Sequence, residues 1–508
     1  MKKIQIMDTT LRDGEQTQNV SFTPYEKLNI TKMLIDDVKV DRVEVGNARV
    51  SSGELKAIQK IIGWAKENNH LDKIEVLGFV DLNKSVDWLI ESGGKVINLL
   101  CKGSLKHCEG QLRKTKEEHL SDIKKTVEYA KENQLTVNIY LEDWSNGMLN
   151  SKDYVYFMID GLSKLNVNRI MLPDTLGILD PNKTSRLLKE ILNKYPKQKF
   201  DYHAHNDYGL ANANSLAAVN VGVDCIHVTV NGLGERTGNT NLDEFAVAIR
   251  DFSDFECNID EINLNKISKI VQTFSGKRVA SNKPITGEDV FTQTAGIHAD
   301  GDKKGDLYHS KLSPSRFARE RNYALGKLSG KASLEHNLKK LNIELDELRK
   351  RKVLKKIIEL GDLKKTITIE DLPFIITSVL EAPDKRKIKV EKCLIITDLG
   401  KQPKAEITLK YNDKLVEEES EGDGGYDAFM NAIKKIKFNF DLPELIDYEV
   451  RIPPGGNTNA LVETTITWKS LKNGTFRTKG VDSDQVIASV KATENMLNII
   501  STKITTIK

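Results

Sequence analysis

Eight short apolar runs, rich in β-branched residues, alternate with helix-like segments between residues 3 and 232. A strand that is followed each time by a helix indicates parallel strands joined by helical crossovers. Eight such units predict an α/β fold, the (β/α)8 or TIM barrel. The predicted strands are KIQIMD (3–8), RVEVGN (42–47), KIEVLGFVD (73–81), KVINLL (95–100), TVNIYLED (136–143), RIMLPDT (169–175), KFDYHAHND (199–207) and CIHVTVNG (225–232).

The segments between these runs have the residue spacing of amphipathic helices. In the segment 51–69, apolar residues recur at helical intervals and occupy one face. The segment 115–133 shows the same spacing and begins with Thr115, a residue type that caps helix N-termini. These segments are therefore expected to cover the barrel with their apolar faces.

The chain has 508 residues, which exceeds the size of one ordinary domain. We expect a barrel over 1–280 and a linker region over 281–383 that begins in loops and becomes mostly helical. A charged, Pro-containing connection, EAPDKRK (381–387), leads to an expected α+β domain over 388–508. In that last region three strands and a helix occur twice, which indicates a small internal repeat.

The composition argues against several classes of partner. The net charge of +3 gives no reason to expect nucleic acid or a membrane surface. The N-terminus lacks an apolar stretch of signal-peptide length, and no run is long enough to span a bilayer. Five scattered cysteines without a CxxC pair are typical of reduced thiols, so we expect a cytoplasmic protein.

Polar residues are concentrated at the ends of the predicted strands. Active sites of this fold lie where the strands end and the strand-to-helix loops begin. The sequence therefore predicts an active site at that end of the barrel. The polar residues there are Asp8, Asp13, Glu44, Asn47, Asp81, Glu142, Asp143, Asp174, Thr175, His203, His205, Asp207 and Asn231.

Two histidines in HAHND have the spacing of a metal site. His203 and His205 are two positions apart in a predicted strand, so their side chains point to the same face. With Asp13 they supply two nitrogens and one oxygen, a set that suits Zn²⁺, Mn²⁺ or a related divalent ion. The alternative is a pair of hydrogen-bonded structural histidines.

Other polar residues allow more than one role. Arg12 can pair with a carboxylate, or it can bind a substrate carboxylate or oxyanion. Glu142 is a candidate base or substrate-holding carboxylate, and the glycine-rich segment NGLGERTGN (231–239) is expected to be a tight loop that carries Asn239. The segment GIHADGDKKGDLY (296–308) is expected to be a polar connecting loop, unless its residues take part in the chemistry.

Three motifs together resemble a known family. DTTLRDGEQ (8–16), HAHND (203–207) and NGLGERTGN occur in this order in the acetyl-CoA-dependent condensing enzymes, which are the 2-isopropylmalate, homocitrate and citramalate synthases. The resemblance spans the whole chain. It implies that the barrel is catalytic, that the linker region over 281–383 contributes to the active site, and that 388–508 is a regulatory amino-acid-binding domain. Three further segments, YLEDWSNG, GEDVFTQTAGIHADGDKKG and GVDSDQVIASVKATE, are most similar to the bacterial (R)-citramalate synthases within this family.

The resemblance implies roles for individual residues. It implies that a divalent ion (Zn, Mn or Mg) is held by Asp13, His203 and His205, with Asn239 nearby. It also implies that one subunit of a homodimer supplies catalytic residues to the active site of the other. The implied catalytic residues are Arg12, Glu142, His298, Asp300 and Tyr308; the substrate-binding residues are Arg12, Leu77, Leu100, Tyr140 and Thr175; and Tyr426 and Asp427 lie in a glycine-rich turn suited to a regulatory ligand.

The implied reaction condenses acetyl-CoA with a 2-oxo acid and water. A base, Glu142 or His298, removes a methyl proton from acetyl-CoA, the enolate attacks the ketone, and water then cleaves the thioester. A wall of Leu77, Leu100 and Tyr140 favours pyruvate, which gives (R)-citramalate and predicts isoleucine as a feedback inhibitor. The alternative is 2-oxoisovalerate as substrate and leucine as effector. A metal-dependent lyase or aldolase and a non-catalytic amino-acid sensor are further alternatives.

Overall fold

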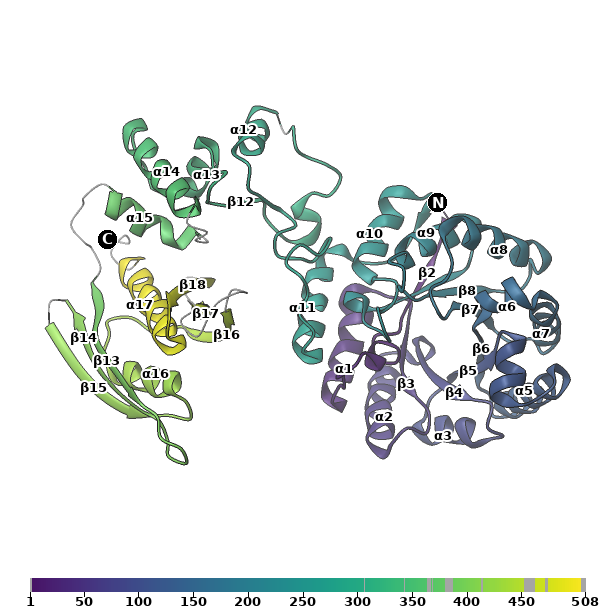
Figure 1. Cartoon of the computed structure of the whole chain (residues 1–508). Helices are drawn as coiled ribbons and strands as arrows, with labels where there is room; N and C mark the ends of the chain where they lie inside the picture. Colours follow the sequence, from purple (N-terminus) through teal and green to yellow (C-terminus); the bar gives the residue numbers. More distant parts are fainter. Residues whose placement is uncertain are drawn as a thin grey trace. The chain divides into compact units, whose positions relative to one another are not determined.

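The structure is a computed structural model, and it describes residues 2–305, 307–341, 343–362, 367, 369–379, 387–412, 414–451, 462–470 and 474–503. The chain divides into two compact units, which are described separately below (Figure 1). The first comprises residues 1–292 and 309–322, and the second comprises residues 293–308 and 323–508. The predicted connection over 381–387 lies outside the described residues except for its last position.

The first unit contains a closed barrel of eight parallel strands in chain order, which confirms the predicted fold class (Figure 1). The last strand closes on the first, where Ile6 pairs with Ile226. The barrel strands are β2 (Gln5–Asp8), β3 (Arg42–Asn47), β4 (Ile74–Phe79), β5 (Val96–Lys102), β6 (Thr136–Glu142), β7 (Arg169–Asp174), β8 (Phe200–Ala204) and β9 (Cys225–Val228).

Helices surround the strands, as the apolar periodicity predicts. In α5, Thr115 and Glu118 form a capping box, and Ile123, Val127 and Ala130 are buried on the inner face. A short parallel pair, β1 (Lys2–Lys3) and β10 (Phe255–Glu256), lies outside the barrel sheet. The helices are α1 (Pro24–Lys32), α2 (Ser52–Glu67), α3 (Lys84–Ser92), α4 (Leu105–His107), α5 (Lys116–Glu132), α6 (Trp144–Asn150), α7 (Lys152–Lys164), α8 (Pro181–Lys194), α9 (Ala211–Val221), α10 (Leu242–Phe252) and α11 (Leu264–Ser275).

Buried ion pairs fill the barrel interior near the N-terminal ends of the strands. Arg42 contacts Glu75 at 2.7 Å and Asp201 at 2.5 Å. Arg169 contacts the other oxygen of Asp201 at 2.8 Å. The interior at this end is therefore a packed ionic layer, which is consistent with a ligand site at the opposite, C-terminal end.

The second unit begins with helices. The expectation of a polar loop over 296–308 is wrong at α12 (Gly296–Gly305), because this helix carries few apolar residues and so shows little periodicity. A separate apolar core, which includes Leu334, Val353 and Ile357, holds the later helices. The helices of this part are α12, α13 (Lys331–Lys340), α14 (Glu347–Asp362) and α15 (Leu372–Val379). β11 (Thr292–Gln293) and β12 (Asn322–Tyr323) form a two-stranded sheet, and each begins with a residue of the first unit and ends with a residue of the second.

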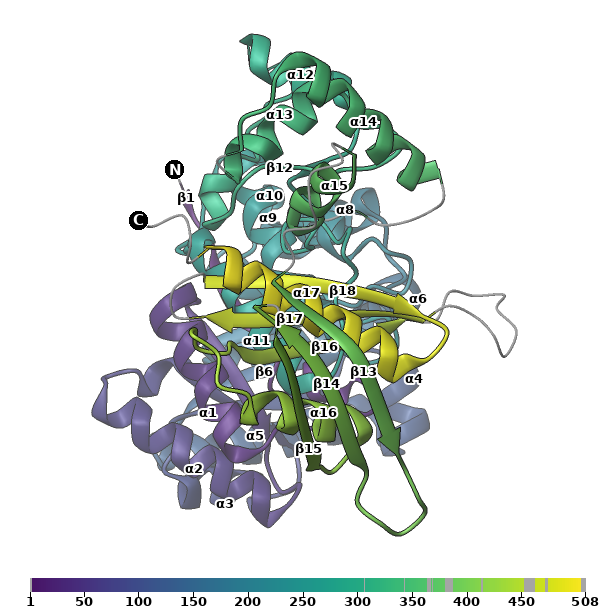
Figure 2. The same cartoon turned by 90° about the vertical axis from the view of Figure 1, so that its left-hand side faces the viewer.

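The C-terminal part has the predicted repeat of three strands and a helix (Figure 2). Both sheets are antiparallel, and one apolar core that includes Phe429 and Trp468 joins the repeats. This confirms the predicted α+β domain. Its elements are β13 (Ile388–Ile396), β14 (Lys404–Tyr411), β15 (Lys414–Glu421), α16 (Gly425–Lys435), β16 (Glu444–Arg451), β17 (Val462–Ser470), β18 (Gly474–Asp482) and α17 (Gln485–Lys503).

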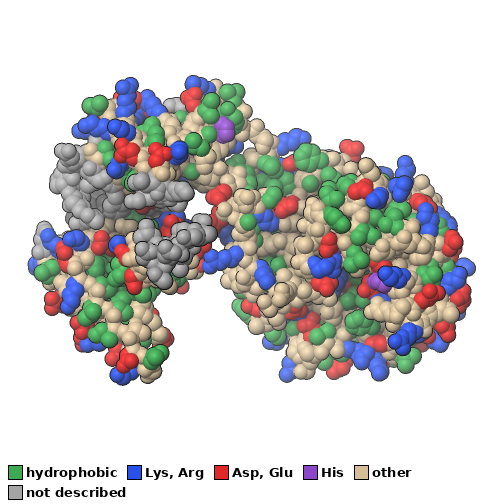
Figure 3. All heavy atoms as spheres, viewed as in Figure 1, with side chains coloured by type: hydrophobic (Ala, Val, Ile, Leu, Met, Phe, Trp, Pro, Cys, Tyr) green, Lys and Arg blue, Asp and Glu red, His purple; other side chains and the backbone are tan. Residues whose placement is uncertain are grey.

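Basic and acidic side chains are interspersed on the face shown in Figure 3. Among the described residues, no helix has both the length and the apolar character that are needed to cross a bilayer.

Candidate active site

Strand alternation brings the predicted site residues into the barrel. On β6, Asn138, Tyr140 and Glu142 occupy alternate positions, and on β8 His203 follows Asp201 by two positions. Alternate residues of a barrel strand face the interior. The residues nearest the C-terminal ends of the strands therefore meet at the mouth, where the DTTLRDGEQ loop also lies.

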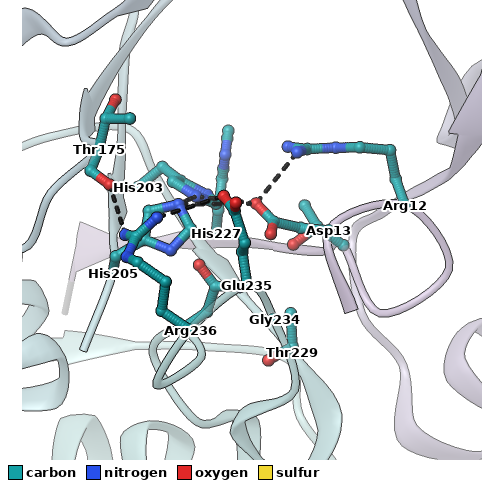
Figure 4. A network of polar contacts seen from close by, with 12 residues as sticks. Arg12, Asp13, Thr175, His203, His205, His227, Thr229, Gly234, Glu235 and Arg236 are labelled. Carbon is teal, nitrogen blue, oxygen red and sulfur yellow. Dashed lines mark hydrogen bonds and ion pairs between the residues drawn. The ribbon is translucent and has the colours of Figure 1, made fainter. Parts of the chain in front are cut away.

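Asp13, His203 and His205 form a buried cluster at this mouth (Figure 4). Nε2 of His203 lies 3.1 Å from Oδ2 of Asp13, and Nε2 of His205 lies 3.9 Å from the same oxygen. The two Nε2 atoms are 3.4 Å apart. One ion can therefore contact both imidazoles and the carboxylate.

Two properties of these residues fit a bound cation: their protonation states, and buried oxygens that have no hydrogen-bond partner. Burial acts to raise the pKa of Asp13, but the charge of Arg12 and the two histidines hold that pKa well below its ordinary value. Burial lowers the pKa of His205 to about 4, so this imidazole is neutral and can act as a ligand. Oδ1 of Asp13 and Oδ1 of Asn239 are buried without a hydrogen-bond partner. Buried acceptors of this kind are rare, and a divalent ion would satisfy them.

A second buried group does not have the chemistry of a metal site. Asp201, Cys225 and His227 also lie close together. However, Asp201 already pairs with Arg42 and Arg169. Burial raises the pKa of the Cys225 thiol to about 12, so it does not offer a thiolate.

The DTTLRDGEQ loop is held by its own backbone and by a buried lysine. The carbonyl oxygen of Thr9 accepts hydrogen bonds from the backbone N–H groups of Arg12 and Asp13 at 3.1 and 2.8 Å. Lys27 is fully buried; its ammonium contacts Glu15 at 2.7 Å and donates to the Leu11 carbonyl at 3.3 Å. The charge of Glu15 is thus structural. Lys27 was not predicted, because a lysine in a helical segment is usually exposed.

Arg12 is fixed beside the cluster by three polar contacts. Its Nε donates to Glu44 at 2.5 Å, and its two Nη atoms donate to Asp13 at 3.0 Å and to the Tyr140 hydroxyl at 3.3 Å. Glu44 in turn accepts from Asn98 at 2.7 Å. The guanidinium is therefore preorganised next to the candidate metal ligands.

Glu142 has a partner that sequence reasoning missed. Lys102 at the end of β5 forms a salt bridge with Glu142, its neighbour in the register of β5 and β6. The backbone N–H of Lys102 donates to Nε2 of the buried His119 at 3.1 Å, which holds the strand end in place. Strand alternation could have predicted this position, because Lys102 lies two residues after Leu100 and its side chain therefore points to the same side of the strand.

The Thr175 hydroxyl can still donate a hydrogen bond to a ligand. Its hydroxyl oxygen accepts the backbone N–H of Asp143 at 2.8 Å. The hydroxyl proton can therefore be donated to another acceptor at the mouth. Arg236, from the glycine-rich loop, donates to the Thr175 carbonyl at 2.7 Å and to Asp207 at 2.8 Å, so the loop is tied to this edge (Figure 4).

The three predicted wall residues lie together inside the barrel. Leu77, Leu100 and Tyr140 belong to one small apolar cluster, which also contains Met7 and Met171. This cluster is separate from the main core between the strands and the helices. The structure thus provides an apolar surface within the same interior as the Asp13 cluster.

Some polar residues at the strand ends have structural roles. Asp174 accepts the backbone N–H groups of Ile178 and Leu179 at 3.1 and 3.0 Å. The predicted strand 225–232 is too long, because β9 ends at Val228 and a 3-10 helix follows. Asn231 lies in that helix with a left-handed φ of 59° and donates to the Ser268 carbonyl at 2.9 Å.

The remaining predicted residues belong to the second unit. The rings of His298 and Tyr308 lie 4.2 Å apart, and Asp300 pairs with Lys304 at 2.6 Å. The hydroxyl groups of Tyr426 and Thr493 are 2.7 Å apart. Asp427 accepts the backbone N–H of Asp423 at 3.0 Å.

Family profiles match three consecutive parts of the chain. An HMGL-like profile matches residues 3–272, a homocitrate synthase post-HMGL domain profile matches 285–365, and a LeuA allosteric (dimerisation) domain profile matches 366–501.

Curated relatives match over nearly the whole length. The (R)-citramalate synthase CimA of Methanocaldococcus jannaschii is 34% identical, with 98% of this chain and 99% of the relative covered. The 2-isopropylmalate synthase of the same organism is also 34% identical, with 99% of this chain and 95% of the relative covered. The putative (R)-citramalate synthase CimA of Methanopyrus kandleri is 34% identical, with 96% of this chain and 95% of the relative covered. These relatives are archaeal, so a particular similarity to the bacterial enzymes stays a prediction. The chain belongs to the HMGL-like family, within the branch of acyl-transferring condensing enzymes that contains the citramalate and 2-isopropylmalate synthases.

Proposed function

We propose that the barrel condenses acetyl-CoA with pyruvate and water to give (R)-citramalate and CoA. The observation that carries the proposal is the apolar wall of Leu77, Leu100 and Tyr140 inside the barrel that holds the Asp13 cluster and Arg12. A 2-oxo acid needs polar groups for its two oxygen functions and an apolar surface for its side chain. A wall of two leucines and a tyrosine suits a methyl group better than an isopropyl group.

The residues for a divalent ion are Asp13, His203 and His205, with the Oδ1 atom of Asn239 as a further ligand. Their two nitrogens and two oxygens fit Zn²⁺ or Mn²⁺ better than Mg²⁺, which prefers oxygen ligands alone; the Oδ1 atoms of Asp13 and Asn239 are buried without a hydrogen-bond partner. When bound, such an ion supplies Lewis acidity toward the ketone of the 2-oxo acid.

The side chains around the cluster supply the other roles. Arg12 binds the 2-oxo acid and stabilises the negative charge that develops on the ketone oxygen. The free proton of the Thr175 hydroxyl is available to the substrate carboxylate. Glu142, oriented by Lys102, is one candidate for the base that takes the methyl proton of acetyl-CoA, and His298 is the other.

His298, Asp300 and Tyr308 act, in this proposal, from one subunit of a cytoplasmic homodimer on the barrel of the other. They lie close together in and after α12, and the match to a LeuA dimerisation domain supports a dimer.

The C-terminal domain binds isoleucine as a feedback inhibitor, with Tyr426 and Asp427 in contact with the ligand. The match of residues 366–501 to an allosteric domain profile supports this proposal. Saturating isoleucine should inhibit the full-length enzyme, and Tyr426→Ala should relieve the inhibition. An enzyme indifferent to isoleucine would overturn the regulatory proposal.

A second candidate is 2-isopropylmalate synthesis from 2-oxoisovalerate, because relatives of both names are equally similar to this chain. Release of free thiol from acetyl-CoA, measured against a panel of 2-oxo acids, separates the two activities. The same assay separates both from a lyase, an aldolase and a non-catalytic sensor, none of which releases thiol when a 2-oxo acid is added.

A further inference from the structure

The Tyr140 hydroxyl has three buried polar neighbours. Nη2 of Arg12 and Oε2 of Glu44 each lie 3.3 Å from it, and Nδ1 of His227 lies 3.1 Å from it. The hydroxyl has one proton to donate. Arg12 has no lone pair to offer, so the proton goes either to Glu44 or to His227.

Both carboxylate oxygens of Glu44 already accept hydrogen bonds from other donors. Its Oε2 atom already accepts Nε of Arg12 at 2.5 Å, and its Oε1 atom accepts the Asn98 amide at 2.7 Å. Both carboxylate oxygens therefore have a strong donor.

The environment of His227 defines its tautomer. Nε2 of His227 lies 3.3 Å from Oδ2 of Asp201. Asp201 pairs with Arg42 and Arg169, so it is a carboxylate and can only accept. The hydrogen of neutral His227 is then on Nε2, and Nδ1 carries a lone pair. This lone pair accepts the hydroxyl proton of Tyr140.

We infer that His227 is a positioning residue that fixes the ring of Tyr140 as a rigid wall of the 2-oxo acid pocket, and so limits the side chain that the pocket admits. The inference rests on the proposed function. Hydrogen bonds from Arg12 and to His227 hold the Tyr140 hydroxyl, and the His227 ring meets the Tyr140 ring edge-on at 5.5 Å. His227 lies beside His203 in the barrel interior (Figure 4).

A wall that is anchored at its far end resists displacement by a larger substrate. Without His227 the phenol loses one of its two anchors and a packing surface, so the ring can move and admit another methylene. Pockets of this kind discriminate roughly 10- to 200-fold per methylene. Loss of the support from His227 should therefore reduce the discrimination between 2-oxo acids whose side chains differ by one methylene.

The test compares kcat/KM for 2-oxobutanoate and for pyruvate in the metal-loaded, full-length enzyme. His227→Leu and Tyr140→Phe should each raise the 2-oxobutanoate to pyruvate ratio by about 5- to 20-fold, a fraction of the methylene discrimination. The double variant should change the ratio by less than the product of the two single changes, because both substitutions remove the Tyr140–His227 hydrogen bond. His227→Asn can present an oxygen near the position of Nδ1 and should keep a ratio closer to the wild type.

His70→Leu is the control. Nε2 of the partly buried His70 contacts Asp36 at 3.3 Å, and this contact involves neither Tyr140 nor a residue of the pocket wall. This variant should leave the ratio unchanged. The inference is overturned if folded His227→Leu keeps the wild-type ratio or, should that variant not fold, if Tyr140→Phe keeps it. A wild-type enzyme that releases no thiol with any 2-oxo acid would instead refute the proposed function.

Discussion

Nε2 of His203 lies 3.1 Å from Oδ2 of Asp13, across the barrel interior between the seventh strand and the loop that follows the first. These residues are 190 positions apart in the chain, yet both are buried and both offer a ligand atom to the same point. Asp13→Asn and His203→Ala should therefore bind a divalent ion at least about 10- to 100-fold more weakly, a loss typical even of outer-shell changes.

Calorimetric titration of the chelator-treated enzyme with Mn²⁺ or Zn²⁺ measures this loss, and circular dichroism shows that the variant is folded. His70→Ala is a control, because His70 contacts Asp36 at the surface. Unchanged metal affinity in folded His203→Ala would contradict the assignment.

Lys102 should control catalysis through Glu142. In Lys102→Met the ammonium that orients the Glu142 carboxylate is lost. We expect kcat to fall by about 10- to 100-fold, part of the contribution of a well-placed acid or base, while KM for the 2-oxo acid changes little. Lys102→Arg should restore part of kcat.

The Lys152–Glu190 pair, 3.0 Å apart on the helical surface, provides the matched control. Lys152→Met should leave both constants unchanged. Equal effects of Lys102→Met and Lys152→Met on kcat would show that the Lys102–Glu142 contact does not contribute to catalysis.

Asp8 should make stability depend on pH. Burial raises the pKa of Asp8 from 3.8 to about 7, and hydrogen bonds from Thr10 only partly oppose this. The folded state thus holds the proton more tightly than the unfolded chain, so the wild type loses stability as pH rises from about 4 to about 7. Asp8→Asn cannot ionise and should escape that loss.

The thermal unfolding midpoints of the two proteins should be similar near pH 4.5 and should diverge, in favour of Asp8→Asn, up to pH 8. Asp72→Asn, at an exposed carboxylate, should show no such trend. A difference between Asp8→Asn and wild type that is the same at both pH values would refute the prediction.

Several of these relationships could not be read from the sequence. The strands and most helices of the barrel were predictable because alternation and helical spacing are local, and the cluster was predictable because its residues occur in short motifs. Lys27 and Lys102 were missed, since only tertiary packing shows that these lysines are buried. His227 was missed because its role depends on Tyr140 and Asp201, neither of which is near it in sequence.

Subunit mixing should reveal whether His298 acts across a dimer. Arg12→Ala and His298→Ala should each be inactive alone. In a mixed dimer, one active site would carry neither substitution if His298 acts on the partner barrel, so activity should recover to about one quarter of wild type when exchange is random. No recovery, after exchange has been demonstrated by differently tagged subunits, would contradict action between subunits.

The central claim is that this barrel condenses acetyl-CoA with pyruvate. Its most direct test measures kcat/KM for thiol release from acetyl-CoA with pyruvate and with 2-oxoisovalerate, using the metal-loaded enzyme and identifying the product. The account predicts one citramalate per thiol released and a preference for pyruvate of at least about 10-fold, the lower limit for rejection of a larger apolar side chain. Preference for 2-oxoisovalerate, or no thiol release with either acid, would contradict it.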